Sequence, residues 1–532
     1  MAIRNHGAWW QTSIFYQVYP RSFYDSNNDG VGDLQGIRQK LDYLQWLGID
    51  AIWLSPICKS PMADFGYDVS DYTCVDPIFG TMEDFDALLE DIHQRGMKLV
   101  LDFVPNHTSS EHPWFQESRS SRTNAKSDWY IWRDPTPEGK RPNNWESFIG
   151  DSAWDYDEQR GQYYLHIFYD KQPDLNWRNP EVRAALYDVM RYWLDRGVDG
   201  LRIDAIWMLL KDPQLHDDPP NPAWQEGGFP GDQQLRSHME DQPGIHDIAR
   251  EMRAVADAYQ DRVLIGEIHL PLDRFIRYYG GAALDEIHLP FNFALITAQW
   301  KAPEVRQIVD QYEAALPRGA WPDWALGCHD YVRVRNRIGR EQERVAHMLL
   351  LTLRGTPICY YGDEIEMCDG EVPPQKVRDP EAIAAPRFDR GAYRTPMQWN
   401  SEPNAGFSRQ TPWLAAVKDS DGDDVAAQCD HPASHLTMIR RLIQIRSNHP
   451  ALRSGTYQAV DTSCTDVFAY LRETDEQRVL VVLNFVGTQQ HLDLSQVSQY
   501  ARVLCSTTMQ RDGEIALNQV ALEPNEGLML LV

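Results

Sequence analysis

The chain of 532 residues lacks three features that would point to other classes of protein. It has no surplus of positive charge. A net charge of −27 opposes binding to nucleic acids and to anionic membranes, so we expect neither as a partner. No apolar run reaches transmembrane length without a charge, and the first residues contain no apolar run of signal-peptide length. We therefore expect a cytoplasmic protein that acts on a small molecule as a monomer or homodimer.

Closely spaced cysteine pairs are also missing. The eight cysteines are scattered and never occur as Cys-x-x-Cys, which argues against a zinc site or a disulfide framework. What the chain does have is 42% hydrophobic and 11% aromatic residues, a composition typical of a globular protein. Its length exceeds that of one compact core, so we expect two or three domains.

Runs typical of buried strands alternate with helical periodicity through most of the chain, which implies a parallel sheet. The strands are expected at 14–19, 51–55, 98–104, 200–205, 263–268, 286–291, 324–326 and 357–361. Eight strands are the number that closes a (β/α)₈ barrel, also called a TIM barrel. One helix is expected over 34–47, and a Thr81–Asp84 capping box begins another.

The alternation of predicted strands and helices is interrupted at two places. Residues 108–173 are polar and aromatic, with an alternating run at 163–169, and predict an inserted B subdomain after strand three. Helical periodicity ends near Leu452, and the runs beyond it are typical of antiparallel strands. We predict an α/β fold with a barrel over 1–107 and 174–452, the B domain over 108–173 and a C-terminal β-sandwich domain over 453–532.

Acidic side chains occur at the ends of several predicted strands: Asp102, Asp204, Glu267 and Asp330. In a barrel these ends share one rim, where active sites lie. Each residue alone could be an ordinary cap or ion-pair partner. Together they suit glycosidic bond cleavage, which needs one carboxylate as nucleophile and one acid for the leaving oxygen.

Local sequence suggests which carboxyl group plays which part. Arg202 and Asp204 are two residues apart, so they point to the same side of the strand. An adjacent guanidinium lowers the pKa of a carboxyl group, so we expect Asp204 to be ionised. Glu267 has no cation nearby in the sequence, and burial beside other carboxylates predicts a raised pKa and a protonated general acid.

An acidic loop follows the first strand. Its oxygen donors sit at positions 1, 3, 5, 7 and 9, as in an EF-hand, but position 12 is Gly36 rather than Glu. The sequence favours a structural Ca²⁺ or Mg²⁺ and no organic cofactor, with an Asx-rich turn without metal as the alternative. The expected ligands are Asp25, Asn27, Asp29, the Val31 carbonyl and Asp33.

Several segments resemble the conserved blocks of the α-amylase family, glycoside hydrolase family 13. The four main blocks are Asp102–His107, Gly200–Ala205, Gly266-Glu267 and His329-Asp330. Three further segments resemble its exo-acting α-glucosidase and oligo-1,6-glucosidase branch: Gln172–Asn176, Tyr16–Phe23 and Arg394–Trp399. The metal loop and the inserted segment resemble that branch as well.

The resemblance implies a role for each matching residue. Asp204 matches the nucleophile, Glu267 the acid/base, and Asp330 the carboxylate that stabilises the transition state. Asp64 and Arg394 would hold the terminal 4-hydroxyl and make the pocket blind. The residues implied to line the glucose site are Asp64, Tyr67, His107, Arg202, His329 and Arg394.

The implied activity is that of a retaining exo-α-glucosidase, which releases α-D-glucose from short α-glucosides such as maltose and also transfers glucose. Ala205 and Gly227-Gly228 resemble enzymes that prefer α-1,4 links, whereas oligo-1,6-glucosidases have Val after the nucleophile. Cys328 departs from the Asn usual before His-Asp. A sucrose-acting enzyme, a transglucosylase and an oligo-1,6-glucosidase stay open. A non-catalytic relative, such as a transporter heavy chain, would lack the carboxylates.

Overall fold

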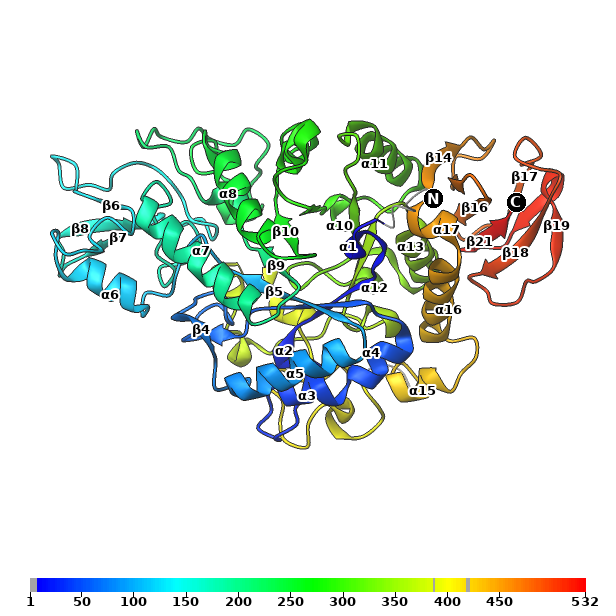
Figure 1. Ribbon diagram of the computed structural model, residues 1–532, viewed down its shortest axis with the longest axis horizontal. Coiled ribbons are helices and arrows are strands. Elements are labelled where there is room, and N and C mark those ends of the chain that lie inside the picture. Colours follow the sequence, from blue (N-terminus) through cyan, green and yellow to red (C-terminus); the bar gives the residue numbers. More distant parts are fainter. Residues whose placement is uncertain (1–6, 386–387, 418–421) are drawn as a thin grey trace.

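The structure is a computed structural model that describes residues 7–385, 388–417 and 422–532. Its centre is a sheet of eight parallel strands (Figure 1). The strands are β1 Phe15–Val18, β2 Ala51–Leu54, β5 Lys98–Phe103, β9 Gly200–Ile203, β10 Val263–Glu267, β11 Leu289–Phe291, β12 Asp323–Ala325 and β13 Thr356–Tyr360. They follow one another in chain order around the sheet, and β13 pairs with β1. The predicted barrel is thus confirmed, nearly closed between β11 and β12.

The register of the parallel strands aligns their carboxyl ends. Asp102 of β5 lies opposite Arg202 of β9, and Ile265 of β10 lies on the other side of Arg202. Glu267 ends β10, and Asp204 directly follows β9. Side chains from three neighbouring strands therefore meet at one rim.

Helices cover the barrel, and their caps follow from the sequence. Thr81 and Asp84 form the expected capping box of α5, and the Asn179 side chain accepts the Glu181 amide at the start of α7. The single helix expected over 34–47 is wrong: α3 and α4 meet at Lys40, whose N–H bonds the Ile37 carbonyl in a tighter turn.

The helices have these bounds: α1 Trp9–Thr12, α2 Pro20–Phe23, α3 Leu34–Gln39, α4 Leu41–Leu47, α5 Met82–Gln94, α6 Pro113–Ser120, α7 Pro180–Asp195, α8 Ile245–Asp257, α9 Leu272–Phe275, α10 Ala294–Thr297, α11 Ala302–Ala315, α12 Val334–Ile338, α13 Arg340–Thr352, α14 Pro380–Ala384, α15 Val425–Cys429, α16 His435–Asn448 and α17 Pro450–Ser454. Across the described ranges, no helix is long and apolar enough to cross a membrane.

Between β5 and α7 the chain forms α6 and a small antiparallel sheet of β6 Trp132–Arg133, β7 Trp154–Asp157 and β8 Gln162–Leu165. The alternation over 163–169 predicts a longer strand than the structure contains. β8 ends at Leu165, and a turn closed by the Gln172 N–H on the Tyr169 carbonyl follows. Two short strands that the sequence did not indicate, β3 Cys58–Lys59 and β4 Asp71–Val75, follow β2.

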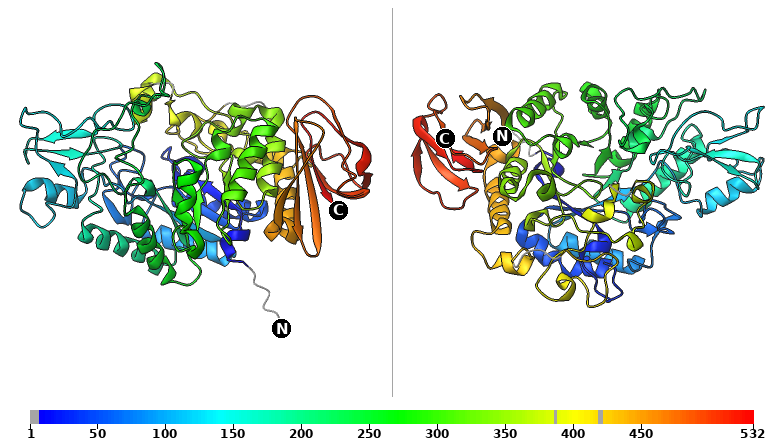
Figure 2. Two further views of the ribbon diagram at one scale, coloured as in Figure 1. Left: turned by 90° about the horizontal axis from the view of Figure 1, so that it is seen from above. Right: turned by 180° about the vertical axis from the view of Figure 1, so that it is seen from behind.

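The C-terminal part is built of antiparallel strands, as predicted. A six-stranded sheet contains β14 Thr456–Val460, β15 Val467–Thr474, β16 Gln477–Asn484, β18 Tyr500–Ser506, β19 Glu514–Ala516 and β21 Gly527–Leu531. β17 Gln490–Leu492 and β20 Val520–Leu522 form a second, two-stranded sheet. All views place this part and the inserted segment at opposite ends of the long axis (Figures 1 and 2).

Candidate active site

Arg202 is the centre of the carboxylate cluster at the barrel rim. One guanidinium nitrogen donates to Asp102 Oδ1 at 2.8 Å and to Asp204 Oδ1 at 2.7 Å. The other donates to Glu267 Oε2 at 2.7 Å. Its side chain is 2% exposed, so the three ion pairs are shielded from water. The strand register thus brings two sequence-predicted catalytic residues onto one fixed cation.

Asp330 is held by a second group of polar side chains. His329 Nε2 lies 3.0 Å from Asp330 Oδ2, and Arg394 Nη2 donates to Asp330 Oδ1 at 2.7 Å. Gln17 Nε2 lies 2.8 Å from His329 Nδ1, and the Tyr67 hydroxyl lies 2.7 Å from Nε2. Tyr67 also donates to Asp102 at 3.2 Å, which connects this group to the carboxylates around Arg202.

The charges around Asp330 keep it ionised. Burial acts to raise the pKa of this carboxyl group, but the hydrogen bond from His329 and the positive charges of Arg394 and Arg390 hold it well below the ordinary value. Burial lowers the pKa of His329, so its ring is neutral at pH 7. A fixed anion therefore stands beside two hydrogen-bonding groups, as stabilisation of a developing positive charge requires.

The pKa shifts of Asp204 and Glu267 in the substrate-free site run opposite to those expected from the sequence. Burial and the nearby charge of Glu267 raise the pKa of Asp204 well above its ordinary value, despite Arg202. Burial also acts to raise the pKa of Glu267, but Arg202 and a hydrogen bond with His269 lower it to about 2. Arg202 contacts both carboxylates, whereas His269 contacts only Glu267, 3.0 Å away. The two shifts therefore favour a proton on Asp204 rather than on Glu267.

Asp64 is paired with Arg390, which the sequence analysis did not identify. Arg390 Nη2 donates to Asp64 Oδ1 at 2.9 Å, and Gln172 Nε2 donates to Oδ2 at 3.2 Å. Burial raises the pKa of Asp64 to about 6, although Arg390 and Arg394 both oppose this. Arg394, the residue expected beside Asp64, instead bonds Asp330 and the His329 carbonyl.

The two residues missed by sequence reasoning, Arg390 and His269, are close in sequence to predicted site residues. Arg390 begins the 3₁₀ helix Arg390–Tyr393, which Arg394 directly follows, and both arginines bond Asp330 Oδ1. His269 follows Glu267 by two residues, the spacing that places two side chains on the same side of extended chain.

His107 is a predicted site residue whose hydrogen bonds go to the Tyr67 backbone and to Asn106. Its Nε2 lies 3.1 Å from the Tyr67 carbonyl, and its Nδ1 lies 3.2 Å from the Asn106 amide. Burial lowers its pKa to about 3, so it is neutral. Within the described residues, the hydrogen bonds of His107 therefore fix the backbone of Tyr67 and involve no carboxylate.

Ala205, Gly228 and Cys328 are the residues that the sequence analysis connected with linkage preference or with the geometry of the His-Asp block. Ala205 is buried with φ +47°, and its N–H bonds Glu267 Oε2 at 3.2 Å. Gly228 stands where a Cβ would lie 2.8 Å from the Trp224 ring, so the turn itself requires glycine. Cys328 is buried in a hydrophobic cluster with Phe291, facing the barrel core.

The expected metal loop offers only oxygen donors. Asp25 Oδ2 accepts the Gly30 N–H at 2.8 Å, and Asp29 Oδ1 accepts the Val31 N–H at 2.8 Å. Asp33 caps α3 by accepting the Gly36 N–H at 2.6 Å. Asp25 Oδ2 and Asp29 Oδ1 each keep a second lone pair, whereas Asp33 Oδ1 also accepts the Ser26 hydroxyl at 2.8 Å. An all-oxygen donor set suits a hard cation. The residues therefore fit Ca²⁺ or Mg²⁺, while the amide bonds also hold the loop as Asx turns.

The chain matches one family description over most of its length. Residues 17–455 match "Alpha amylase, catalytic domain", and residues 467–527 match "Alpha-amylase SusG C-terminal domain". The chain belongs to the α-amylase family of glycoside hydrolases, and it is an enzyme of the α-glucosidase type within that family.

Named relatives cover nearly the whole chain. The probable alpha-glucosidase of Rhizobium meliloti (strain 1021) is 41% identical, over 90% of this chain and 89% of its own length. The oligo-1,6-glucosidase of Parageobacillus thermoglucosidasius is 38% identical, over 90% of each chain. The crystal structure of the alpha-glucosyl transfer enzyme XgtA is 39% identical with a TM-score of 0.92, over 99% of this chain and 100% of that one.

Proposed function

We propose that this protein is a retaining exo-α-glucosidase that prefers α-1,4 links and also transfers glucose. The observation that carries the proposal is that the Asp204 and Glu267 carboxyl groups both bond the guanidinium of Arg202, at 2.7 Å each. Inverting glycosidases separate their carboxyl groups by about 6.5–9.5 Å to admit a water, whereas retaining enzymes bring them to about 5–5.5 Å. Two carboxyl groups bonded to neighbouring nitrogens of one guanidinium lie close together, which favours the retaining arrangement.

The chemistry requires one proton to move within the pair. Asp204 must be ionised to attack the anomeric carbon, and Glu267 must be protonated to donate to the leaving oxygen. Transfer of the proton from Asp204 to Glu267 produces this state without uptake from solvent. After the glycosyl–Asp204 bond forms, ionised Glu267 takes a proton from water or from a sugar hydroxyl. Hydrolysis and transfer therefore differ only in the acceptor.

A buried hydrogen-bonded group beside the carboxylates supports the exo action. The buried group consists of Asp64, Gln172 and Arg390, which are hydrogen-bonded to one another through Asp64. Arg394 bonds Asp330, and its positive charge also lowers the pKa of Asp64. These side chains suit the hydroxyl groups of one terminal glucose. The proposed partners are thus short α-glucosides, held with Tyr67 and His329 beside the ring.

The product profile of the wild-type enzyme tests this proposal. We expect the enzyme to release glucose from maltose. We expect its kcat/KM for maltose to exceed that for isomaltose by about 10–200-fold, because a change of one methylene group in a pocket alters transition-state binding by about 1–3 kcal/mol. Maltose, isomaltose, sucrose and trehalose would be compared by kcat/KM with identification of products. Faster cleavage of isomaltose than of maltose would favour the oligo-1,6-glucosidase alternative. Isomerisation of sucrose would favour the sucrose-acting alternative.

Ala205→Val is expected to shift the maltose-to-isomaltose ratio towards isomaltose. The added methyl groups would narrow the space directly beside Asp204, where an α-1,4-linked sugar must fit. Because Ala205 has φ +47°, a β-branched residue also strains the backbone, so some loss of stability is expected. Ala205→Gly is the matched control: it permits this φ without adding bulk, and the ratio should not move towards isomaltose. An unchanged ratio in the Val variant would show that position 205 does not set linkage.

The loop of Asp25, Asn27, Asp29, Val31 and Asp33 is proposed to hold a structural Ca²⁺ or Mg²⁺. Its residues stabilise the turn into α3 and contribute no catalytic acid. EDTA should therefore lower the melting temperature more than it lowers turnover at mild temperature. The measurement is thermal denaturation and activity with and without EDTA, followed by return of each cation. Lost activity with an unchanged melting temperature would exclude a structural role.

We propose a cytoplasmic location on the state of the cysteines. Cys58, Cys328, Cys359 and Cys505 are buried thiols outside any disulfide, which suits a reducing compartment.

A further inference from the structure

A second cluster of ligand-type side chains lies outside the proposed active site. Asp212, His216 and His238 each offer one ligand atom, and the three atoms lie within 4.8 Å of one another. His216 Nδ1 is 2.6 Å from Asp212 Oδ2, and His238 Nδ1 is 3.6 Å from the same oxygen. We propose that this histidine cluster binds one divalent transition-metal ion of the Zn²⁺ type.

The spacing suits tetrahedral coordination. Zn²⁺ binds nitrogen and carboxylate oxygen at about 2.0–2.2 Å, so neighbouring ligand atoms in a tetrahedron are roughly 3.3 Å apart. The two separations from Asp212 Oδ2 fall on either side of this value, and small side-chain rotations would equalise them. Imidazole donors favour Zn²⁺, Cu²⁺ or Ni²⁺ over Ca²⁺ and Mg²⁺, which prefer oxygen alone.

The backbone already holds the three residues together. The Asp212 N–H donates to the His238 carbonyl at 2.9 Å, and the His216 N–H donates to Asp212 Oδ2 at 3.1 Å. The Trp145 indole of the inserted segment donates to the His216 carbonyl at 2.9 Å. The Asp218 carboxylate accepts the His238 N–H at 2.9 Å and adds negative charge beside the cluster. A metal would therefore enter a site whose framework is largely formed.

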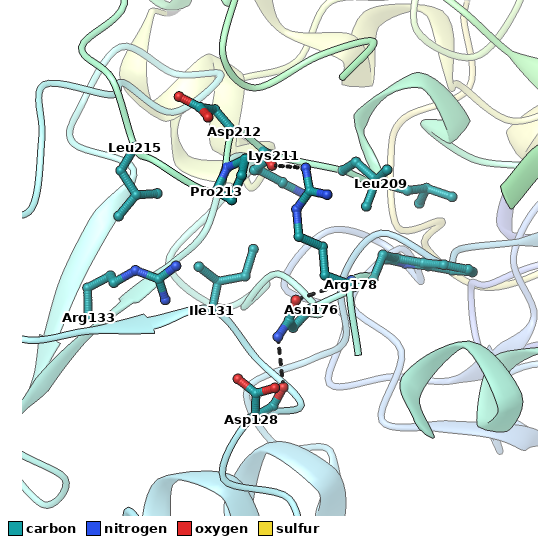
Figure 3. A pocket seen from close by; sticks show the side chains of 12 residues that line it. Asp128, Ile131, Arg133, Asn176, Arg178, Leu209, Lys211, Asp212, Pro213 and Leu215 are labelled. Carbon is teal, nitrogen blue, oxygen red and sulfur yellow. Dashed lines mark hydrogen bonds between the residues drawn. The ribbon is translucent and has the colours of Figure 1, made fainter. Parts of the chain in front are cut away.

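The site leaves a coordination position for water. The side chains of His216 and His238 are 59% and 32% exposed, whereas Asp212 is 11% exposed. Asp212 stands at the edge of a pocket whose wall includes Arg178, Lys211 and Leu215 (Figure 3). Asp212 and His238 come from opposite parts of the chain between β9 and α8. The bound ion would thus cross-link the two ends of this long connection and stabilise its folded conformation.

A competing group must be distinguished from the histidine cluster. Cys328, His329 and Asp330 also place ligand atoms within 4.8 Å of one another. Both nitrogens of His329 already have hydrogen-bonding partners, Gln17 and Tyr67, so a metal there would disrupt the proposed active site. Binding at this group would bring a thiolate to the ion and would inhibit the enzyme.

The test is a Zn²⁺ titration of the chelator-stripped full-length enzyme by calorimetry, with Mg²⁺ as the comparison metal. We expect one site per chain that prefers Zn²⁺, and a higher melting temperature when it is filled. His216→Gln and His238→Gln should each weaken binding at least about tenfold. His246→Gln is the matched control, because His246 is also partly exposed and bonded to a carboxylate, that of Glu286, outside the cluster.

Replacing Zn²⁺ with Co²⁺ distinguishes binding at the histidine cluster from binding at Cys328, His329 and Asp330. The histidine cluster contains no thiolate, so its Co²⁺ complex should show no thiolate charge-transfer absorption. Variants that fold, as judged by circular dichroism, and bind Zn²⁺ as the wild type does would overturn the proposal. So would absence of binding by the wild type, or binding only with a thiolate signature.

Discussion

Asp204→Asn is expected to lower kcat by about 10⁴–10⁶-fold, because an amide cannot supply the nucleophilic carboxylate and loss of a nucleophile typically has this effect. The substitution is close in size to the carboxylate. Arg202 keeps its bonds to Asp102 and Glu267, so the fold should persist. Single-turnover kinetics on maltose and on 4-nitrophenyl α-glucoside, with circular dichroism, measure both points. The loss should be similar for the two substrates.

Glu267→Gln is the comparison that separates the two roles. A general acid matters less when the leaving group departs without protonation, so the expected loss of about 10²–10⁴-fold on maltose should shrink on 4-nitrophenyl α-glucoside. If instead Asp204→Asn showed this dependence on the leaving group and Glu267→Gln did not, the two roles would have to be exchanged.

Arg390→Gln is expected to reduce stability by about 3–5 kcal/mol, because removal of one partner leaves buried carboxylates without a counter-charge. Arg390 contacts two buried carboxylates, Asp64 at 2.9 Å and Asp379 at 2.7 Å. It also contacts two partly buried ones, Asp330 at 3.3 Å and Glu381 at 3.4 Å. Urea denaturation at pH 7 measures the change in free energy of unfolding.

The same variant should also lose kcat/KM at pH 7. The pKa of Asp64 is about 6 with Arg390 present, and removal of that positive charge raises it further. Asp64 would then be largely protonated at pH 7, and activity should recover as the pH is raised. The control is Arg378→Gln, an exposed arginine in the same loop, which should change neither quantity. Full stability and activity in the Arg390 variant would contradict its assigned position.

The barrel could be predicted because its information is local. Period-two apolar runs and capped helices mark the strands and helices, and parallel register then sends Asp102, Asp204 and Glu267 to one rim. The same reasoning found the Arg202–Asp204 pair, two residues apart on one strand. The inserted and C-terminal parts were apparent where the alternation stopped.

The rest depends on distances that periodicity does not encode. Arg390 comes from the long loop after β13, where no repeat indicates which side chains turn inward. The proton on the catalytic pair depends on Arg202 reaching across to β10 and on His269 bonding Glu267. Sequence spacing shows that Arg202 is near Asp204, but not that it is equally near Glu267. The left-handed backbone at Ala205 likewise has no signal in the residue itself.

The central claim is that Asp204 attacks the anomeric carbon, and the anomer released first tests it most directly. Two displacements at one carbon retain its configuration, so glucose should be released as the α-anomer before mutarotation. Proton NMR of the wild-type enzyme acting on maltose, recorded within the first minutes, resolves the two anomeric signals. Growth of the α-signal first is the expected result, whereas initial release of β-glucose would contradict the assignment of Asp204 as nucleophile.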